Sequence, residues 1–204
     1  MVRRFLLLLI PALICSVYAI SQNTILKLNG RTVPALRYEL KGDWLYYVKT
    51  DDEKEKLRRL DKYDIFSVLK ADGTEDVIYD PDTSLDGDPT EMEVRRYIMG
   101  EQHAMATYNK PFNRPVGAGV GLTSAFFTGF YAPIGIFTYT LIIGRFDTKD
   151  IPYSTMIEPE VFNTEEFRSG YKKYARNKKI KQSLVWGGIG FAVGFPAFFL
   201  IFHD

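Results

Sequence analysis

The sequence predicts an α+β membrane protein, in which a small SH3-like or Sm-like β-barrel precedes an amphipathic helix and a two-helix transmembrane hairpin. Residues 116–144 and 183–202 are runs of 29 and 20 positions without a charged side chain. About 20 apolar residues of helix cross a bilayer, whose interior requires every backbone N–H and C=O group to be paired internally. The whole chain has 204 residues, 25% charged residues and a net charge of +1, so a polar domain accompanies the apolar runs.

Residues 1–21 have the pattern of a secretory signal peptide. Two arginines form a basic start, and residues 5–17 form an apolar stretch that is too short to span a membrane easily. We expect cleavage after Ser21; cleavage after Ala19 and retention as an uncleaved anchor are the alternatives. The single cysteine, Cys15, lies in this segment behind a poor lipoprotein motif. A cleaved chain would therefore have no disulfide and no thiolate metal site.

Residues 22–80 carry the signals of short strands and tight turns. The strands are expected over residues 24–28, 31–40, 44–49, 56–60, 64–69 and 77–79. Asn29-Gly30 and Asp72-Gly73 are hairpin dipeptides, because both residue types tolerate positive φ. Five or six short strands in a segment of this length predict a small SH3-like or Sm-like barrel. Such a small domain is marginally stable alone, so support from the membrane part or from a partner is expected.

Residues 81–115 combine a turn-rich acidic loop with an amphipathic helix over residues 91–108. Apolar side chains recur on one face of this helix at helical spacing; they are Val94, Tyr97, Ile98, Met105 and Tyr108. Pro111 and Pro115 end the helix before the first apolar run.

The acidic loop has two interpretations. Oxygen-bearing side chains stand at the spacing of a calcium loop, with Gly87 at the sharp turn; they are Asp82, Ser84, Asp86, Asp88 and Glu93. Thr90 and Glu93 also fit a capping box at the start of the following helix, behind an Asp-Gly turn. We favour the capping box and keep calcium as the alternative.

The first apolar run, residues 116–144, is longer than a single span needs. As one helix it would reach about 43 Å, against about 30 Å of hydrocarbon. It therefore tilts, kinks at Pro133 or breaks into two pieces, and one kinked span is our expectation. The loop 145–182 starts irregularly; Asn163 is then the expected cap of a helix that continues through a basic stretch into the second span, residues 183–204.

Two sets of residues in the helical part have candidate roles. Small residues let helix backbones approach closely, so they are expected to pack the two spans together or to form an oligomer seam; they are Gly117, Gly121, Gly187, Gly190 and Gly194. Basic side chains beside the second span are expected to anchor the topology or to bind anionic lipid; they are Lys172, Lys173, Arg176, Lys178, Lys179 and Lys181.

Charge and export signals indicate a topology. The loop 145–182 holds nine basic and six acidic residues, and fewer basic residues precede the first span. Basic loops stay in the cytoplasm, whereas a signal peptide exports the segment behind it. Both signals place the β domain in the periplasm of a bacterium, the basic loop in the cytoplasm and the spans in the inner membrane.

The reactive residues are too sparse to indicate an enzyme. Neither apolar run contains an ionisable residue, which argues against transport. His103 and His203 have no partner cluster for a metal.

We expect a non-enzymatic membrane adaptor or assembly component of a bacterial envelope complex. Its expected partners are lipid and either an envelope protein or a second copy of the chain, and we expect no cofactor and no nucleic acid. The alternatives are a calcium- or ligand-responsive sensor using the loop from Asp82 to Glu93, and a carboxylate enzyme.

Three segments together resemble a known group of proteins. They are Ile25-Leu26-Lys27-Leu28-Asn29-Gly30, Met99-Gly100-Glu101-Gln102-His103-Ala104 and Gly170-Tyr171-Lys172-Lys173-Tyr174, which leads towards Trp186. The chain is similar to uncharacterised two-span envelope membrane proteins of Bacteroidetes-type bacteria. The resemblance implies a signal peptide, a small β domain and a glycine-rich hairpin, and it implies no reaction. It leads us to expect an acidic residue where this chain has His103, which weakens any role for that position.

Overall fold

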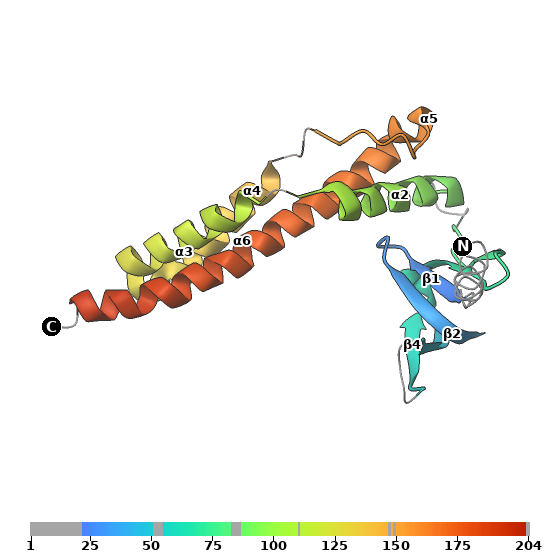
Figure 1. The fold of residues 1–204 in the computed structure, drawn as a ribbon, viewed down its shortest axis with the longest axis horizontal. Helices are drawn as coiled ribbons and strands as arrows, with labels where there is room; N and C mark the ends of the chain where they lie inside the picture. The colour runs from blue at the N-terminus through green and yellow to red at the C-terminus, as the bar shows by residue number, and fades with distance from the viewer. Residues whose placement is uncertain are drawn as a thin grey trace, which may run out of the picture. The chain divides into compact units, whose positions relative to one another are not determined.

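The computed structural model describes residues 22–50, 55–82, 87–109, 111–146, 148 and 150–202. The chain divides into two compact units, Met1–Asp88 and Pro89–Asp204, which we call the β unit and the helical unit. Their elements are labelled in Figure 1. The predicted signal peptide lies outside the described residues.

The β unit is a single antiparallel sheet. Its elements are β1 (Asn23–Lys27), β2 (Thr32–Lys41), β3 (Trp44–Lys49), β4 (Leu57–Asp61), η2 (Lys62–Asp64), β5 (Ile65–Leu69) and β6 (Glu75–Val77). The strand order is β4-β3-β2-β1-β5-β6, so β4 and β6 are the edges of an open sheet. The α+β class is confirmed, whereas closure into the expected barrel is not seen. The last strand begins at Glu75, earlier than the expected 77–79.

Both predicted hairpin dipeptides form turns. Gly30 has φ +71° and Gly73 has φ +88°, which are conformations that glycine adopts without strain. The Asp72 carboxylate accepts hydrogen bonds from the backbone N–H (2.8 Å) and the hydroxyl (2.6 Å) of Thr74. These bonds stabilise the ionised form and lower the pKa of Asp72. Local turn chemistry therefore determines where β1 and β5 reverse.

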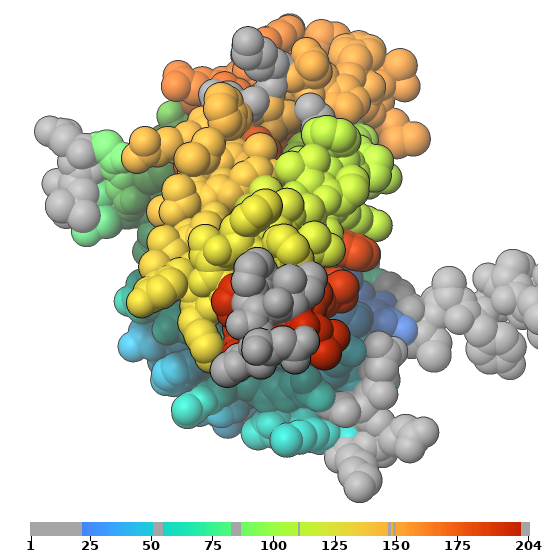
Figure 2. Space-filling model, turned by 90° about the vertical axis from the view of Figure 1, so that its left-hand side faces the viewer, coloured from blue at the N-terminus to red at the C-terminus, as the bar shows by residue number. Residues whose placement is uncertain are grey.

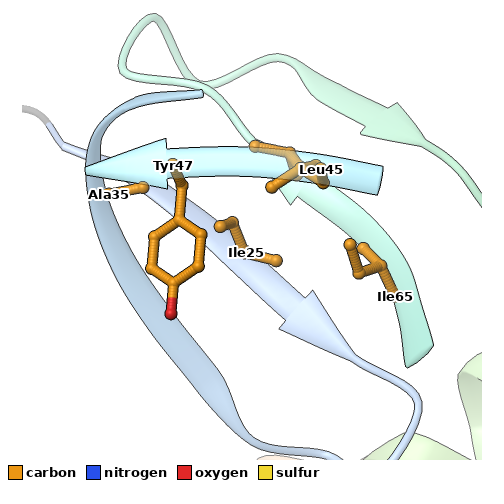
Figure 3. Packing of buried hydrophobic residues seen from close by; sticks show 6 residues of the cluster. Ile25, Ala35, Leu45, Tyr47 and Ile65 are labelled. Atoms are coloured by element: carbon orange, nitrogen blue, oxygen red, sulfur yellow. The ribbon is translucent and has the colours of Figure 1, made fainter. Parts of the chain in front are cut away.

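The β unit has its own hydrophobic core. Side chains from β1, β2, β3 and β5 converge in it, as Figure 3 shows; they are Ile25, Ala35, Leu45, Tyr47, Ile65 and Val68. Leu45 and Tyr47 are two residues apart, so the strand period of two places both on the inner face. Burial of each large side chain contributes about 1.5–3 kcal/mol to folding.

The described part of the helical unit contains four helices of 14–38 residues and two short helical segments. The elements are α2 (Glu91–Thr107), α3 (Asn113–Thr128), η3 (Gly129–Tyr131), α4 (Ala132–Arg145), α5 (Pro159–Phe162) and α6 (Glu165–Phe202). The 38 residues of α6 form one continuous helix, as the sequence indicated. Its cap differs from the prediction, because the Thr164 hydroxyl, not the Asn163 side chain, accepts from the N–H of Phe167 (3.4 Å).

The first apolar run folds back on itself. Helix α3 ends at Gly129, which has φ +53°, and η3 reverses the chain into α4. A Cβ on Gly135 in α4 would lie 2.6 Å from the Ser124 Oγ in α3, so the two helices are in close contact. The expectation of one kinked span is therefore wrong. Pro133 causes no kink, since it occupies the first turn of α4, where proline is tolerated.

Helix α6 packs against α2, α3 and α4. Its N-terminal half packs against α2, where Ala104, Tyr108, Tyr171 and Ala175 form a buried cluster. Its C-terminal half packs against α3 and α4, which lie along it in Figure 1. Figure 2 shows the turn region of α3 and α4, in yellow, beside the red C-terminal part of α6.

Candidate functional site

The exposed side of α3, α4 and the C-terminal half of α6 is strongly apolar. We call these side chains the apolar band; they are Leu122, Phe127, Phe130, Tyr131, Ile134, Phe137, Leu141, Ile142, Val185, Ile189, Val193 and Leu200. The stretches 113–145 and 165–200 are long and apolar enough to cross a membrane, and only 22% of the most apolar window in each is buried. Core helices of soluble proteins bury such windows, so the helical unit is suited to association with a membrane.

The five glycines predicted to pack helices all lie where α6 meets α3 or α4. A Cβ on Gly117 would lie 3.2 Å from the Cα of Ser183, and one on Gly187 would lie 2.7 Å from Ile136 Cγ2. A Cβ on Gly121, Gly190 or Gly194 would meet backbone atoms of the facing helix in the same way. Of the two sequence-based alternatives, this geometry corresponds to packing within one chain.

Sequence reasoning missed a second glycine pair. Gly100 in α2 and Gly170 in α6 sit where these two helices cross, and a Cβ on either would overlap the backbone of the other helix. Each of these glycines stands alone inside an amphipathic helical pattern. Because glycine in a helix interior lowers stability, an isolated glycine there indicates a place where another helix approaches closely.

Two consecutive lysines cap two helix C-termini. Lys178 Nζ donates to the carbonyl of Tyr108 (2.7 Å), directly after α2, and Lys179 Nζ donates to the carbonyl of Phe146 (2.6 Å), directly after α4. Cations stabilise the unpaired carbonyls of a helix C-terminus. Lys179 is only 6% exposed. These two predicted lipid anchors therefore have a contact inside the protein. The two ends of the first apolar run lie close by along α6, because a Cβ on Gly117 would contact Ser183 and one on Gly144 would contact Ile180.

The other predicted anchors are exposed. Lys173 lies 3.6 Å from the buried carboxylate of Glu101 and over the ring of Tyr97. The others are Lys172, Arg176 and Lys181. Arg114 and Arg145, which flank the first apolar run, are also exposed, and the fold places them at the level where Lys178 and Lys179 make their bonds. We call Arg114, Arg145, Arg176 and Lys181 the basic collar.

The structure supports the capping box in the acidic loop. The Glu93 carboxylate accepts from the Thr90 N–H (2.7 Å) and hydroxyl (2.8 Å), and the Thr90 Oγ1 accepts from the Glu93 N–H (3.4 Å). The bond from the Thr90 N–H, and then that from its hydroxyl, lower the pKa of Glu93. The predicted cap of α2 is thus confirmed.

The calcium prediction depends on residues that are only partly described. Ser84 and Asp86 lie outside the described residues, and the Asp88 carboxylate accepts from the Asp82 N–H (2.7 Å). In the part of the chain that the structure describes, no three His, Cys, Asp or Glu residues are grouped to hold a metal. Calcium binding would also require Glu93 to leave its bonds to Thr90.

His103 is a packing residue of the helical unit. Its ring lies 5.7–6.4 Å from the rings of Phe162, Phe167 and Tyr171, and its Nε2 is 2.7 Å from the carbonyl oxygen of Pro152. The tautomer protonated at Nε2 donates this bond and fastens the segment before α5 to α2 and α6. His203 lies outside the described residues.

The β unit has at least two surface hollows among its described residues; one, of about 520 Å³, is lined mainly by Lys62, Tyr63 and residues 78–82, and the other is larger. It has a volume of about 620 Å³ and is formed by β2, β3 and β4; its lining residues are Arg37, Tyr38, Glu39, Lys41, Tyr46, Tyr47, Val48 and Leu57. Tyr38 and Tyr46 are half-buried here and Arg37 is exposed, and tyrosine and arginine are enriched in protein–protein interfaces. We call this surface the β2–β4 face.

Comparison with known protein families, curated proteins and solved structures finds no match to this chain. The resemblance to envelope proteins of Bacteroidetes-type bacteria therefore stays a prediction.

Proposed function

We propose that this protein is a non-enzymatic integral membrane adaptor, or assembly component, of a bacterial envelope complex. The observation that carries the proposal is the division of the chain into a β unit with its own core and a helical unit whose exposed side is apolar. One unit holds the protein in the bilayer and the other is available to a protein partner. Neither role needs a cofactor.

Membrane anchoring explains why the apolar band stays exposed. Scattered apolar residues are normal on soluble surfaces, but a contiguous patch of large aliphatic and aromatic side chains favours association with lipid or protein. The polar half of the helical unit, formed by α2 and the start of α6, carries acidic and basic side chains such as Glu91 and Arg95, whose ion pair is exposed to water. The same helix α6 thus passes from an aqueous to an apolar environment.

The β2–β4 face is the proposed partner-binding surface. The opposite edge of the sheet, β6, is three residues long and carries Glu75 and Asp76, and short charged edges discourage pairing with another strand. The β4 edge is longer, and its Leu57 is 62% exposed. The Arg59 guanidinium lies 4.5 Å from the centre of the Trp44 ring, which adds a flat, partly apolar surface beside this edge.

The proposed location is the bacterial inner membrane, with the β unit in the periplasm. The signal-peptide pattern supports export of the β unit. The proposal does not keep the basic loop 145–182 on the opposite side, because Gly117 and Gly144, near the two ends of the first apolar run, face Ser183 and Ile180 of α6, three residues apart.

In-cell photo-cross-linking tests the adaptor proposal. A photoreactive amino acid replaces Leu57 on the β2–β4 face or, as the matched control, Leu69, a similarly exposed leucine on β5. We expect one discrete protein adduct from position 57, none from position 69, and retention of the protein in carbonate-washed membranes. A strictly monomeric protein without an adduct at position 57 would count against an adaptor.

A further inference from the structure

We propose that residues 113–145 form a re-entrant helical hairpin, which enters and leaves the lipid bilayer on one side. The surface concerned is the apolar band of α3 and α4, and its partner is the hydrocarbon of that leaflet. As a consequence, α2 and the segment 150–164 lie on the same side of the membrane. The inference rests on the proposed membrane association, and it changes the topology that charge counting predicts.

The two ends of the run lie at nearly the same level of α6, where Gly117 faces Ser183 and Gly144 faces Ile180. Tyr108, before α3, and Phe146, after α4, accept hydrogen bonds from the neighbouring lysines Lys178 and Lys179. Neighbouring residues in a helix differ in height by about 1.5 Å. A segment that crossed the bilayer would separate these two carbonyls by about 30 Å.

The two arms of the hairpin, α3 and α4, are each shorter than a helix that crosses the membrane. Helix α3 has 16 residues and α4 has 14, which correspond to about 24 Å and 21 Å. Both fall short of the about 30 Å of hydrocarbon that a crossing helix covers. Each arm is nevertheless long enough to carry the turn beyond the midplane.

The turn between α3 and α4 is chemically suited to hydrocarbon, where unpaired backbone N–H and C=O groups are costly. The Gly129 N–H donates to the Ala125 carbonyl and the Ala132 N–H donates to the Gly129 carbonyl. The Thr128 hydroxyl donates to the Ser124 carbonyl (2.6 Å). Gly129 packs against Phe198 of α6, whose ring would lie 2.9 Å from a Cβ at this position.

The turn and the open end of the hairpin differ in chemistry, as insertion from one side of the membrane requires. Phe127, Phe130 and Tyr131 at the tip are 72–77% exposed and form a surface for acyl chains. At the other end, the exposed side chains of the basic collar lie at the start of α3, the end of α4 and the adjoining part of α6. Cations of this kind are attracted to anionic headgroups, so the collar favours a fixed depth of insertion.

Cysteine labelling in the full chain tests the sidedness. Cys15→Ser removes the only cysteine. Met92→Cys in α2 and Met156→Cys before α5 then report on two exposed sites, 61% and 96% exposed. With a membrane-impermeant maleimide, we expect both to be labelled in one of two preparations, intact spheroplasts or inverted vesicles, and to lose labelling in the other. Labelling from opposite sides would overturn the hairpin.

A disulfide tests the fold-back independently of sidedness. Ser124→Cys with Gly135→Cys brings two thiols together across α3 and α4, whereas a continuous helix would hold them about 16 Å apart, too far for a disulfide. After treatment with a lipid-soluble oxidant and then denaturation in detergent, which exposes any remaining free thiol, we expect maleimide labelling to be lost at both sites. Ser124→Cys with Phe137→Cys, whose second residue is exposed to lipid, is the matched control and stays labelled. Persistent labelling of the 124–135 pair would overturn the fold-back.

Failure of membrane association gives a different result. If the protein is released from membranes by carbonate and position 156 is labelled in every preparation, the proposed anchoring is wrong and the topology proposal falls with it. If the protein stays in the membrane while positions 92 and 156 are labelled from opposite sides, anchoring holds and the re-entrant hairpin alone is refuted.

Discussion

The close contact between α3 and α6 makes a strong prediction about Gly121. A Cβ at this position would overlap the Gly187 carbonyl oxygen and lie 2.8 Å from its carbon and 2.9 Å from the Phe191 nitrogen. These are backbone atoms and cannot rotate away, so Gly121→Ala must push the helices apart. Gly119, two residues earlier on the same helix, has nothing within 4 Å of a Cβ and provides the matched control.

The magnitude follows from two opposing effects. Replacing glycine by alanine inside a helix gains about 0.8–1 kcal/mol in propensity, and this gain applies to both positions. Overpacking a well-packed contact costs about 1–3 kcal/mol, and this cost applies only at Gly121. The difference in unfolding free energy between the two variants therefore isolates the clash, at about 1–3 kcal/mol. For a chain of this size, that corresponds to a difference in Tm of about 2–12 °C.

The measurement is the thermal loss of helical circular dichroism for both variants in the same mild detergent. We expect Gly119→Ala to melt at or above the temperature of the original protein and Gly121→Ala to melt below it. Gly190→Ala, which meets the backbone of Ala118, and the open position Gly188→Ala repeat the comparison from the side of α6. Equal melting temperatures within each pair would refute the close approach of α3 and α6.

Three further predictions concern the cap and the β core. Thr90→Ala removes the capping box and should cost about 0.5–2 kcal/mol, seen as faster amide exchange in the first turn of α2, while Thr90→Ser retains protection. The pKa of Glu93 is lowered in the folded state, so the ionised carboxylate stabilises the fold above its unfolded pKa of about 4.3, and this stabilisation is lost as the pH falls through the folded pKa. Glu93→Gln should therefore flatten this part of the acid denaturation curve. An unchanged curve would contradict the cap. Leu45→Ala in the fully buried core should cost about 2–5 kcal/mol in denaturant unfolding of the β unit, whereas Leu57→Ala on the exposed edge should stay within about 0.5 kcal/mol; equal losses would refute the core.

The elements of the β unit were predictable because their signals are local. Asn29-Gly30 and Asp72-Gly73 define two turns, and alternation around Leu45 and Tyr47 defines an inner face. Whether the sheet closes is a different question, since closure depends on pairing between strands distant in the sequence. The edges β4 and β6 do not pair, and no local pattern announces this.

The fold-back of the first apolar run escaped prediction for a physical reason. Proline is the usual cause of a kink in a helix, so the sequence predicted a kink at Pro133. In the structure Pro133 lies in the first turn of α4, where proline fits without distorting the helix. The reversal occurs at Gly129, one of six glycines in the run, and depends on positive φ and on the Phe198 ring packed against it. Hydropathy is the same for one long helix and for two short antiparallel helices, so composition alone cannot separate them.

The fold-back also changes how the two topology signals relate. On the sequence, the export signal and the basic loop agreed, because the first run was taken to separate them by one crossing. In a re-entrant hairpin there is no such crossing, so the basic collar and the segment leading from the β unit into α2 share one side. Export of the β unit then places the collar against the outer leaflet of the inner membrane, where its charges meet lipid headgroups rather than determine orientation. A cytoplasmic collar would instead require that residues 1–21 do not export the segment behind them. The labelling side of position 92 decides between these two outcomes, because the two arrangements place this residue on opposite sides of the membrane.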